Sequence, residues 1–270
     1  MLVNQELITK YNFKEIQLTR RDRDVLVFIE EQGFASFNQL NRKFFLSKGY
    51  CSERLNKLCA FRYLKKCDLK DFFISKKMND VSGGYFPHLL SLNVKPHQKI
   101  YHIDRNYAQG WLRSQGLFKP SMLLHQLILN EVRMFLEKEI EHQYIFNDPI
   151  LKTLSFIEFG RNEEVVPDMS IEDGKLKIAV EVERTPKGRT RYFKRFNFFR
   201  DSVYTHVIYY YVDDSQLKPL LKRAGKTNKF AFAHYTQPDQ LISPVWGMVS
   251  LSEFLHKSIE MNQKNRKKWE

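Results

Sequence analysis

The chain has 270 residues, of which 43% are hydrophobic and 14% aromatic, and this composition excludes a disordered protein. Its net charge of +13 is unevenly placed: residues 1–120 carry 21 Lys and Arg against 11 Asp and Glu, and residues 121–270 carry 23 against 20. A basic N-terminal half favours a nucleic-acid partner, because Lys and Arg attract phosphates and release their counterions. The alternative is that the basic residues only keep the surface soluble and bind no nucleic acid.

The N-terminus is polar and resembles no signal peptide. The longest apolar runs, at 25–29 and 206–212, are far shorter than a membrane span, so we expect a cytoplasmic protein with no membrane partner. Cys51, Cys59 and Cys67 form no CxxC pair, and this spacing predicts reduced thiols rather than a zinc site.

Three short helices are predicted near the N-terminus. Thr19 is a suitable N-cap for the first helix, Gly33 ends it, and Ser36 caps the second. Lys48-Gly49 is expected to be a break, and the third helix is expected over residues 50–64.

Strands predicted at 63–69 and 99–103 follow these helices, and the order predicts a winged helix-turn-helix domain over residues 1–118. A small helical bundle that binds protein is the alternative. In a winged helix the third helix enters the major groove of double-stranded DNA. The positions of that helix expected to point outward are Ser52, Glu53, Asn56 and Lys57. The residues expected near the phosphate backbone are Arg20, Arg21, Arg42, Lys43, Lys48, Tyr50 and Arg54.

A second domain is expected over residues 119–260, followed by a basic tail at 261–270. It opens with a helix over 122–140, capped by Ser121, whose core-facing stripe contains Glu131. A buried acid needs a partner or a role. We therefore expect Glu131 either to pair with a cation from a neighbouring element or to join the acids of the following hairpin.

That hairpin is predicted over residues 165–183, with a turn at Glu172-Asp173-Gly174. Side chains alternate along a strand, so Glu181 and Glu183 point the same way, and Asp168 lies roughly opposite on the first strand. In one interpretation Asp168 and Glu181 hold a divalent metal, with Mg²⁺ as the candidate cofactor. In the other, the acids line a solvated sheet face and pair with cations. The cations considered are Lys177, Arg184 and Lys187.

The remaining elements complete an α/β pattern. They are a strand at 144–146, a helix rich in Lys and Arg after Thr185-Pro186, strands at 203–212 and 230–234, and helices at 214–223 and 251–259. The full order, α–β–β–β–α–β–α–β–α, predicts a mixed α/β fold in which helices cover both faces of a mixed sheet. An Asp on one strand and a Glu on the next, before a basic helix, looks like the layout of the PD-(D/E)xK, restriction-endonuclease-like fold.

The chain as a whole resembles the replication-relaxation family over residues 17–225. The resemblance is carried by the predicted winged helix, the helix at 125–133, Val166-Pro167-Asp168 and Val180-Glu181-Val182-Glu183-Arg184. It implies a DNA-binding protein of a bacterial plasmid or other mobile element that acts in replication, mobilisation or transfer. It also implies a nuclease-like second domain.

One residue departs from the active nuclease pattern: Glu183 stands where a lysine is expected, two residues after Glu181. The catalytic set then becomes Asp168, Glu181 and Glu183 with Lys187 as the replacement cation, and Lys177 and Lys194 are further candidates for that cation. A working site would make the protein a Mg²⁺-dependent endonuclease or nickase, and a degenerate site would leave a DNA-binding protein. A third candidate is a transcriptional regulator whose second domain mediates dimerisation. The candidate partners besides DNA are replication or relaxosome proteins and a second copy of the chain.

Overall fold

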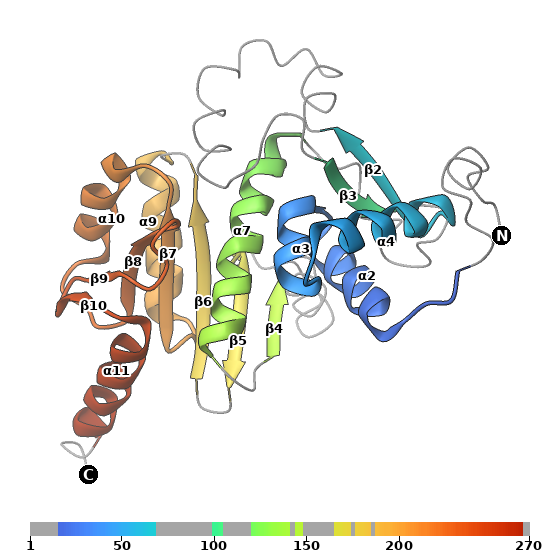
Figure 1. Ribbon diagram of the computed structural model, residues 1–270. Coiled ribbons are helices and arrows are strands. Elements are labelled where there is room, and N and C mark those ends of the chain that lie inside the picture. The colour runs from blue at the N-terminus through green and yellow to red at the C-terminus, as the bar shows by residue number, and fades with distance from the viewer. Residues whose placement is uncertain are drawn as a thin grey trace, which may run out of the picture. The chain divides into compact units, whose positions relative to one another are not determined.

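The structure is a computed structural model, and it describes residues 16–68, 99–104, 120–140, 144–147, 165–173, 176–184 and 187–266. Over these ranges the chain is mixed α/β, with seven α-helices, a three-stranded sheet and a seven-stranded sheet (Figure 1). It divides into two compact units, Met1–Glu131 and Val132–Glu270, and the division falls inside helix α7. The boundary expected after residue 118 lies outside the described residues. None of the described helices is long and apolar enough to cross a membrane.

The first unit combines helices with a small antiparallel sheet of strand order β1-β3-β2. Its elements are α2 (Arg20–Gln32), β1 (Ala35–Ser36), α3 (Phe37–Phe44), α4 (Lys48–Ala60), β2 (Leu64–Asp68), β3 (Lys99–Ile103) and the first part of α7 (Pro120–Glu139). Fully buried apolar side chains from the three short helices and β1 form its core. They include Val25, Ile29, Ala35, Leu40, Leu55 and Leu58.

The helix boundaries of this unit follow their caps. Thr19 and Ser36 each form a capping box with the third residue of the following helix, and Gly33 ends α2 with a φ of 78°. These three predictions are confirmed, because a hydroxyl at the N-cap satisfies free N–H groups and glycine tolerates positive φ.

Two predicted helix starts are wrong. The side chain of Ser47 accepts from the backbone N–H of Tyr50, so α4 begins at Lys48 and the expected break becomes its first turn. Ser121 was expected to cap the next helix, but α7 begins at Pro120, which suits a first helical turn because it lacks an N–H.

The second unit is built on the seven-stranded sheet, whose order is β10-β9-β8-β7-β6-β5-β4. The strands are β4 (Tyr144–Asn147), β5 (Met169–Asp173), β6 (Leu176–Glu183), β7 (His206–Tyr211), β8 (Phe230–His234), β9 (Leu241–Ser243) and β10 (Gly247–Val249). β4, β5 and β6 run antiparallel, β6, β7 and β8 run parallel, and β9 and β10 return antiparallel. The sequence did not predict β9 and β10. The hairpin turn at Gly174 and part of the tail lie outside the described residues. The helix expected to open at Thr185-Pro186 begins instead at Arg189, with Gly188 as its N-cap, so Lys187 is not on it.

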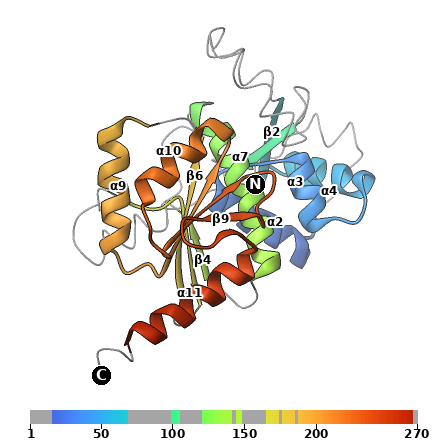
Figure 2. The ribbon, with the colours of Figure 1, turned by 90° about the vertical axis from the view of Figure 1, so that its left-hand side faces the viewer.

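Helices cover the sheet of this unit on two sides. α9 (Arg189–Asp201) and α10 (Leu217–Ala224) lie side by side on one face (Figure 2). There Phe196 and Phe199 of α9 pack with Tyr209 of β7. On the opposite face, the ring of His206 lies 5.3 Å from that of Phe254 in α11 (Leu251–Arg266). The predicted mixed sheet with helices on both faces is thus confirmed for the described part of this unit.

Candidate functional site

The predicted acidic hairpin is present, and its acids lie beneath α9. β5 and β6 pair antiparallel, with Met169 opposite Val180. Ala179 packs against α9 and α10, so the alternation of the strand places Glu181 and Glu183 on that same face. Both carboxylates are buried. The solvated sheet face considered from the sequence is therefore wrong for these two residues.

Glu181 forms a buried ion pair with a residue that the sequence did not single out. Arg195 of α9 donates through Nη2 to Oε1 of Glu181 at 2.6 Å and to the carbonyl of Val166 at 3.0 Å. Tyr209 lies beside Glu181 on β7 in the parallel register. Among the described residues, Oε2 of Glu181, Nε of Arg195 and the hydroxyl of Tyr209 have no hydrogen-bond partner.

Burial controls the protonation of this cluster. It raises the pKa of Glu181 to about 7, although Arg195 opposes the increase, and Asp168 adds to it. Burial followed by the charge of Glu181 raises the pKa of Tyr209 well above its usual value. Burial would lower the pKa of Arg195, but Glu181 and Asp168 outweigh it and keep the guanidinium charged. The cluster thus holds a permanent cation next to a carboxylate that can accept a proton near neutral pH.

Glu183 is paired separately. Lys187, in the segment before α9, donates through Nζ to Oε2 of Glu183 at 2.8 Å. Of the three lysines considered as the replacement cation, only Lys187 contacts one of these acids within the described part of the chain. Lys177 pairs with Glu172 on the neighbouring strand, and Lys194 is exposed.

Asp168 lies just before β5, where its Oδ2 accepts the backbone N–H of Val182 at 2.8 Å. It is therefore close to Glu181, as the sequence predicted, but both carboxylates already have donors. Mg²⁺ prefers six oxygen ligands in near-octahedral geometry and keeps several waters. Within the described ranges, no group of three or more His, Cys, Asp or Glu is placed to hold a metal ion. Arg195 supplies the positive charge at Glu181, so these residues as arranged do not fit a divalent cation.

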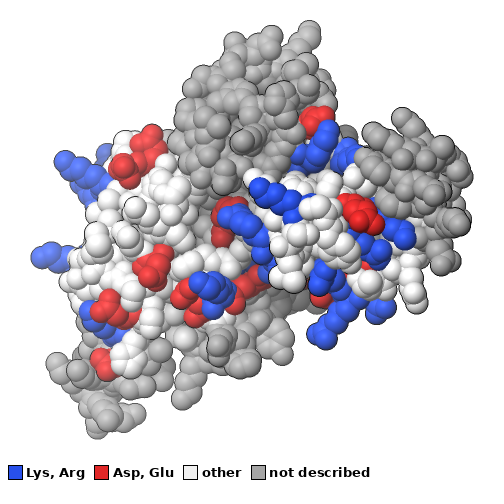
Figure 3. Space-filling model, viewed as in Figure 1, with Lys and Arg blue, Asp and Glu red and all other residues white. Residues whose placement is uncertain are grey.

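The predicted DNA-contacting residues of the first unit fall into three groups. Arg20, Arg21, Arg42, Lys48 and Tyr50 are exposed; Lys43, Ser52, Arg54 and Lys57 are half-buried; Asn56 is buried. In Figure 3, Lys and Arg side chains predominate over the surface formed by α2, α3 and α4. This face combines the start of α2 with the first turn of α4.

Aromatic rings organise part of that face. The guanidinium carbon of Arg21 lies 5.6 Å from the ring centroids of both Phe45 and Tyr50, and those two rings meet edge to face. Stacking on aromatic rings positions an arginine without neutralising its charge. Arg21 of α2 and Tyr50 of α4 therefore form one preorganised, exposed pair.

Two predicted base or backbone contacts have internal roles instead. The expectation that Asn56 points outward is wrong: it is 8% exposed, and its Oδ1 accepts from Lys66 of β2. Arg54 bonds to the buried carboxylate of Asp22 and to the carbonyl of Gln17. Burial alone would raise the pKa of Asp22, but its bonds to Arg54 and to the N-cap residue lower it overall. Both side chains hold α4 in place within the unit.

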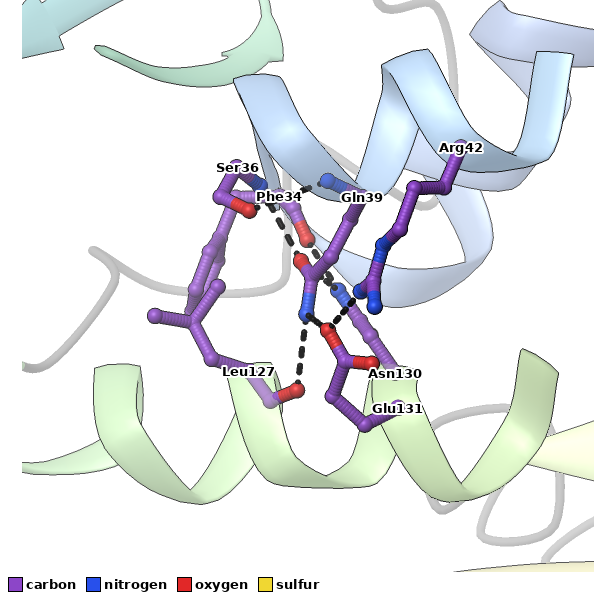
Figure 4. A network of polar contacts seen from close by, with 7 residues as sticks. All are labelled: Phe34, Ser36, Gln39, Arg42, Leu127, Asn130 and Glu131. Carbon is purple, nitrogen blue, oxygen red and sulfur yellow. Dashed lines mark hydrogen bonds and ion pairs between the residues drawn. The ribbon is translucent and has the colours of Figure 1, made fainter. Parts of the chain in front are cut away.

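Glu131 lies in a polar network inside the first unit (Figure 4). Its Oε1 accepts from Nε2 of Gln39 at 3.0 Å and from Arg42. Beside it, Asn130 donates to the carbonyl of Phe34 at 2.9 Å. The predicted pairing of Glu131 with a cation from a neighbouring element is thus confirmed. That cation is Arg42, whose side chain is still 54% exposed.

Comparison with known proteins adds no relative: no family model, curated protein or solved structure matches the chain.

Proposed function

We propose that this protein binds double-stranded DNA through its first unit and carries a nuclease-like second unit whose acidic site is closed by ion pairs. The observation that carries the proposal is the exposed first turn of α4, where Lys48 and Tyr50 accompany Arg21, with Arg20 also exposed. The cations of this face can bind phosphates, and the ring of Tyr50 and the exposed start of α4 can contact the DNA beside them.

The order of the first unit supports a winged helix. α2, α3 and α4 are followed by β2 and β3, and β3 also pairs with β1 to give the three-stranded antiparallel sheet. In that arrangement α4 is the helix that enters the major groove. Its exposed or half-exposed residues there are Lys48, Tyr50, Ser52, Glu53 and Lys57.

The order of the second unit supports a nuclease-like fold. β4, β5 and β6 form an antiparallel meander, and α9 crosses from β6 to the parallel neighbour β7. Asp168 lies directly before β5 and Glu181 lies on the adjacent strand β6, close to the layout that the PD-(D/E)xK resemblance implies. The ion pairs of Glu181 with Arg195 and of Glu183 with Lys187 favour a binding or structural role for this unit over Mg²⁺-dependent cleavage.

The biological setting that we propose follows from the family resemblance: replication, mobilisation or transfer of a bacterial mobile element. Other replication proteins, relaxosome proteins or a second copy of the chain are proposed partners. The proposal is tested by titrating labelled duplex DNA with the full chain at several salt concentrations. Binding that weakens steeply with salt is expected, since phosphate contacts release counterions. Absence of duplex affinity at low salt would overturn the proposal.

A further inference from the structure

The outer surface of α9 and α10 is strongly basic, although the second half of the chain is nearly neutral. Residues 187–229 carry 11 Lys or Arg and 3 Asp or Glu. The other residues of 121–270 carry 12 Lys or Arg and 17 Asp or Glu. The small net charge of this half therefore conceals one basic segment in an acidic background. Eight of the 11 cations lie on the two neighbouring helices α9 and α10 (Figure 2).

The division between the inner and outer faces of these helices is clear. Tyr192, Phe196 and Phe199 of α9 face the sheet. The exposed cations of the pair and of the turn after α10 are Arg189, Arg191, Lys194, Arg200, Lys218, Lys222 and Lys226. Asp201 is the one acid on α9 or α10. Such a surface repels cations and attracts an extended polyanion.

The cations between the helices are held by uncharged acceptors. Arg200 donates to the carbonyls of Arg223 and Ala224 at the end of α10. Arg223 in turn donates to the carbonyl of Arg189 at 3.1 Å. Because carbonyl oxygens carry no net charge, these bonds fix the guanidinium groups without neutralising them. The arrangement is thus rigid and remains positive.

An exposed aromatic ring lies in this basic row. Phe193 is 61% exposed. Arg189 is four residues before it and Arg200 seven residues after it, so helical periodicity places all three on one side of α9. A single exposed hydrophobic residue is ordinary by itself. A ring bracketed by arginines on a basic helix pair is the combination that stacks an unpaired base while cations follow the backbone.

We propose that the α9–α10 surface, comprising Phe193 and the surrounding cations, is a binding site for single-stranded DNA. The face of a base is open to an aromatic ring only where the strand is unpaired, because a duplex stacks its bases internally. This site goes beyond the duplex binding proposed for the first unit and shares no residue with it. A protein with both sites would bind a duplex and an unwound strand.

The ring is tested with the full chain and a fluorescent oligothymidylate. Phe193→Ala is expected to weaken single-strand binding about tenfold, the effect of losing one stacked base. Phe193→Trp is expected to preserve it, and Met248→Ala, which removes an exposed side chain on β10, is the matched control. Equal binding by wild type and Phe193→Ala would overturn the proposal, as would tighter binding of oligouridylate, which would assign the site to RNA.

The cations are tested by salt dependence. Arg189→Gln with Lys222→Gln is expected to reduce the slope of log affinity against log salt by about 1.4 for the single strand, since each phosphate contact contributes about 0.7. Duplex binding is expected to stay within about twofold of wild type, because that site lies on the first unit. Conversely, Arg20→Gln with Lys48→Gln is expected to weaken duplex binding most. An equal loss of both ligands in the α9–α10 variant would overturn a separate site, whereas failure of duplex binding alone would leave it standing.

Discussion

Arg195 of α9 and Glu181 of β6 form a 2.6 Å ion pair whose side chains are 15% and 1% exposed. The two residues are 14 positions apart in the chain and meet because α9 folds back over the strand that precedes it. The pair engages Glu181, one of the two acids that the sequence offered as candidate metal ligands, and several consequences can be measured.

Removing one member of the pair should destabilise the protein. Arg195→Met leaves Glu181 buried beside Tyr209 without its cation, and the free energy of unfolding should fall by about 3–5 kcal/mol, the usual cost of breaking a buried pair. Chemical denaturation measures this loss. Lys194→Met, at the exposed neighbouring position, should change stability by no more than about 0.5 kcal/mol. Similar stabilities for the two variants would contradict the buried pair.

Glu181 should also make stability depend on pH. Its pKa in the folded protein is about 7, raised mainly by burial from an ordinary value of 4.5. Between these two values the folded state binds more protons than the unfolded state, so the contribution of Glu181 to stability falls as pH rises. The fall should be on the order of 3 kcal/mol across this interval. Glu181→Gln should lack this component, and parallel stability profiles for wild type and variant would contradict it.

Added Mg²⁺ should have little effect on the wild type, because Arg195 already neutralises Glu181. The midpoint of thermal unfolding should stay constant as Mg²⁺ is titrated, and supercoiled plasmid should remain intact. A rise in the midpoint, or nicking that disappears in Asp168→Ala, would show instead that the acids bind metal and that the protein cleaves DNA. Asp168→Ala is informative because the carboxylate of Asp168 would be a ligand in a metal site and is a hydrogen-bond acceptor for Val182 in the structure.

Several parts of the fold could be predicted from local sequence. The caps at Thr19 and Ser36, the end of α2 at Gly33 and the strand at 99–103 depend on neighbouring residues, and the structure has them as expected. β9 and β10 were missed because each is three residues long, too short for an alternating pattern.

The partners in the acidic site could not be read from spacing. Whether Glu181 meets a lysine, an arginine or a metal depends on how α9 is rotated over the sheet, which is a property of packing. One signal was present: Arg195 lies three residues after Tyr192 and four before Phe199, beside the apolar stripe of α9. A cation at that position indicates a buried acid as its partner. The outward orientation predicted for Asn56 was wrong for a related reason. Its partner Lys66 lies on β2, and the sequence of α4 alone does not reveal that contact.

Arg54 should behave as a structural residue and Lys48 as a DNA contact. Arg54→Met removes the cation of the buried Asp22 and should lower the free energy of unfolding by about 3 kcal/mol. Lys48→Gln should leave stability within about 0.5 kcal/mol of wild type, since the side chain is exposed. Denaturation and duplex titration of both variants separate the roles. A stable Arg54→Met protein with weakened DNA binding would contradict this assignment.

The most direct test of duplex binding through α2 and α4 compares salt slopes. Arg20→Gln with Lys48→Gln should reduce the slope of log affinity against log salt by about 1.8, because each lost phosphate contact removes about 0.9. Lys138→Gln, an 82% exposed lysine on α7, is the control and should keep the wild-type slope. An unchanged slope in the double variant, or an equal reduction in the control, would contradict DNA binding by this face.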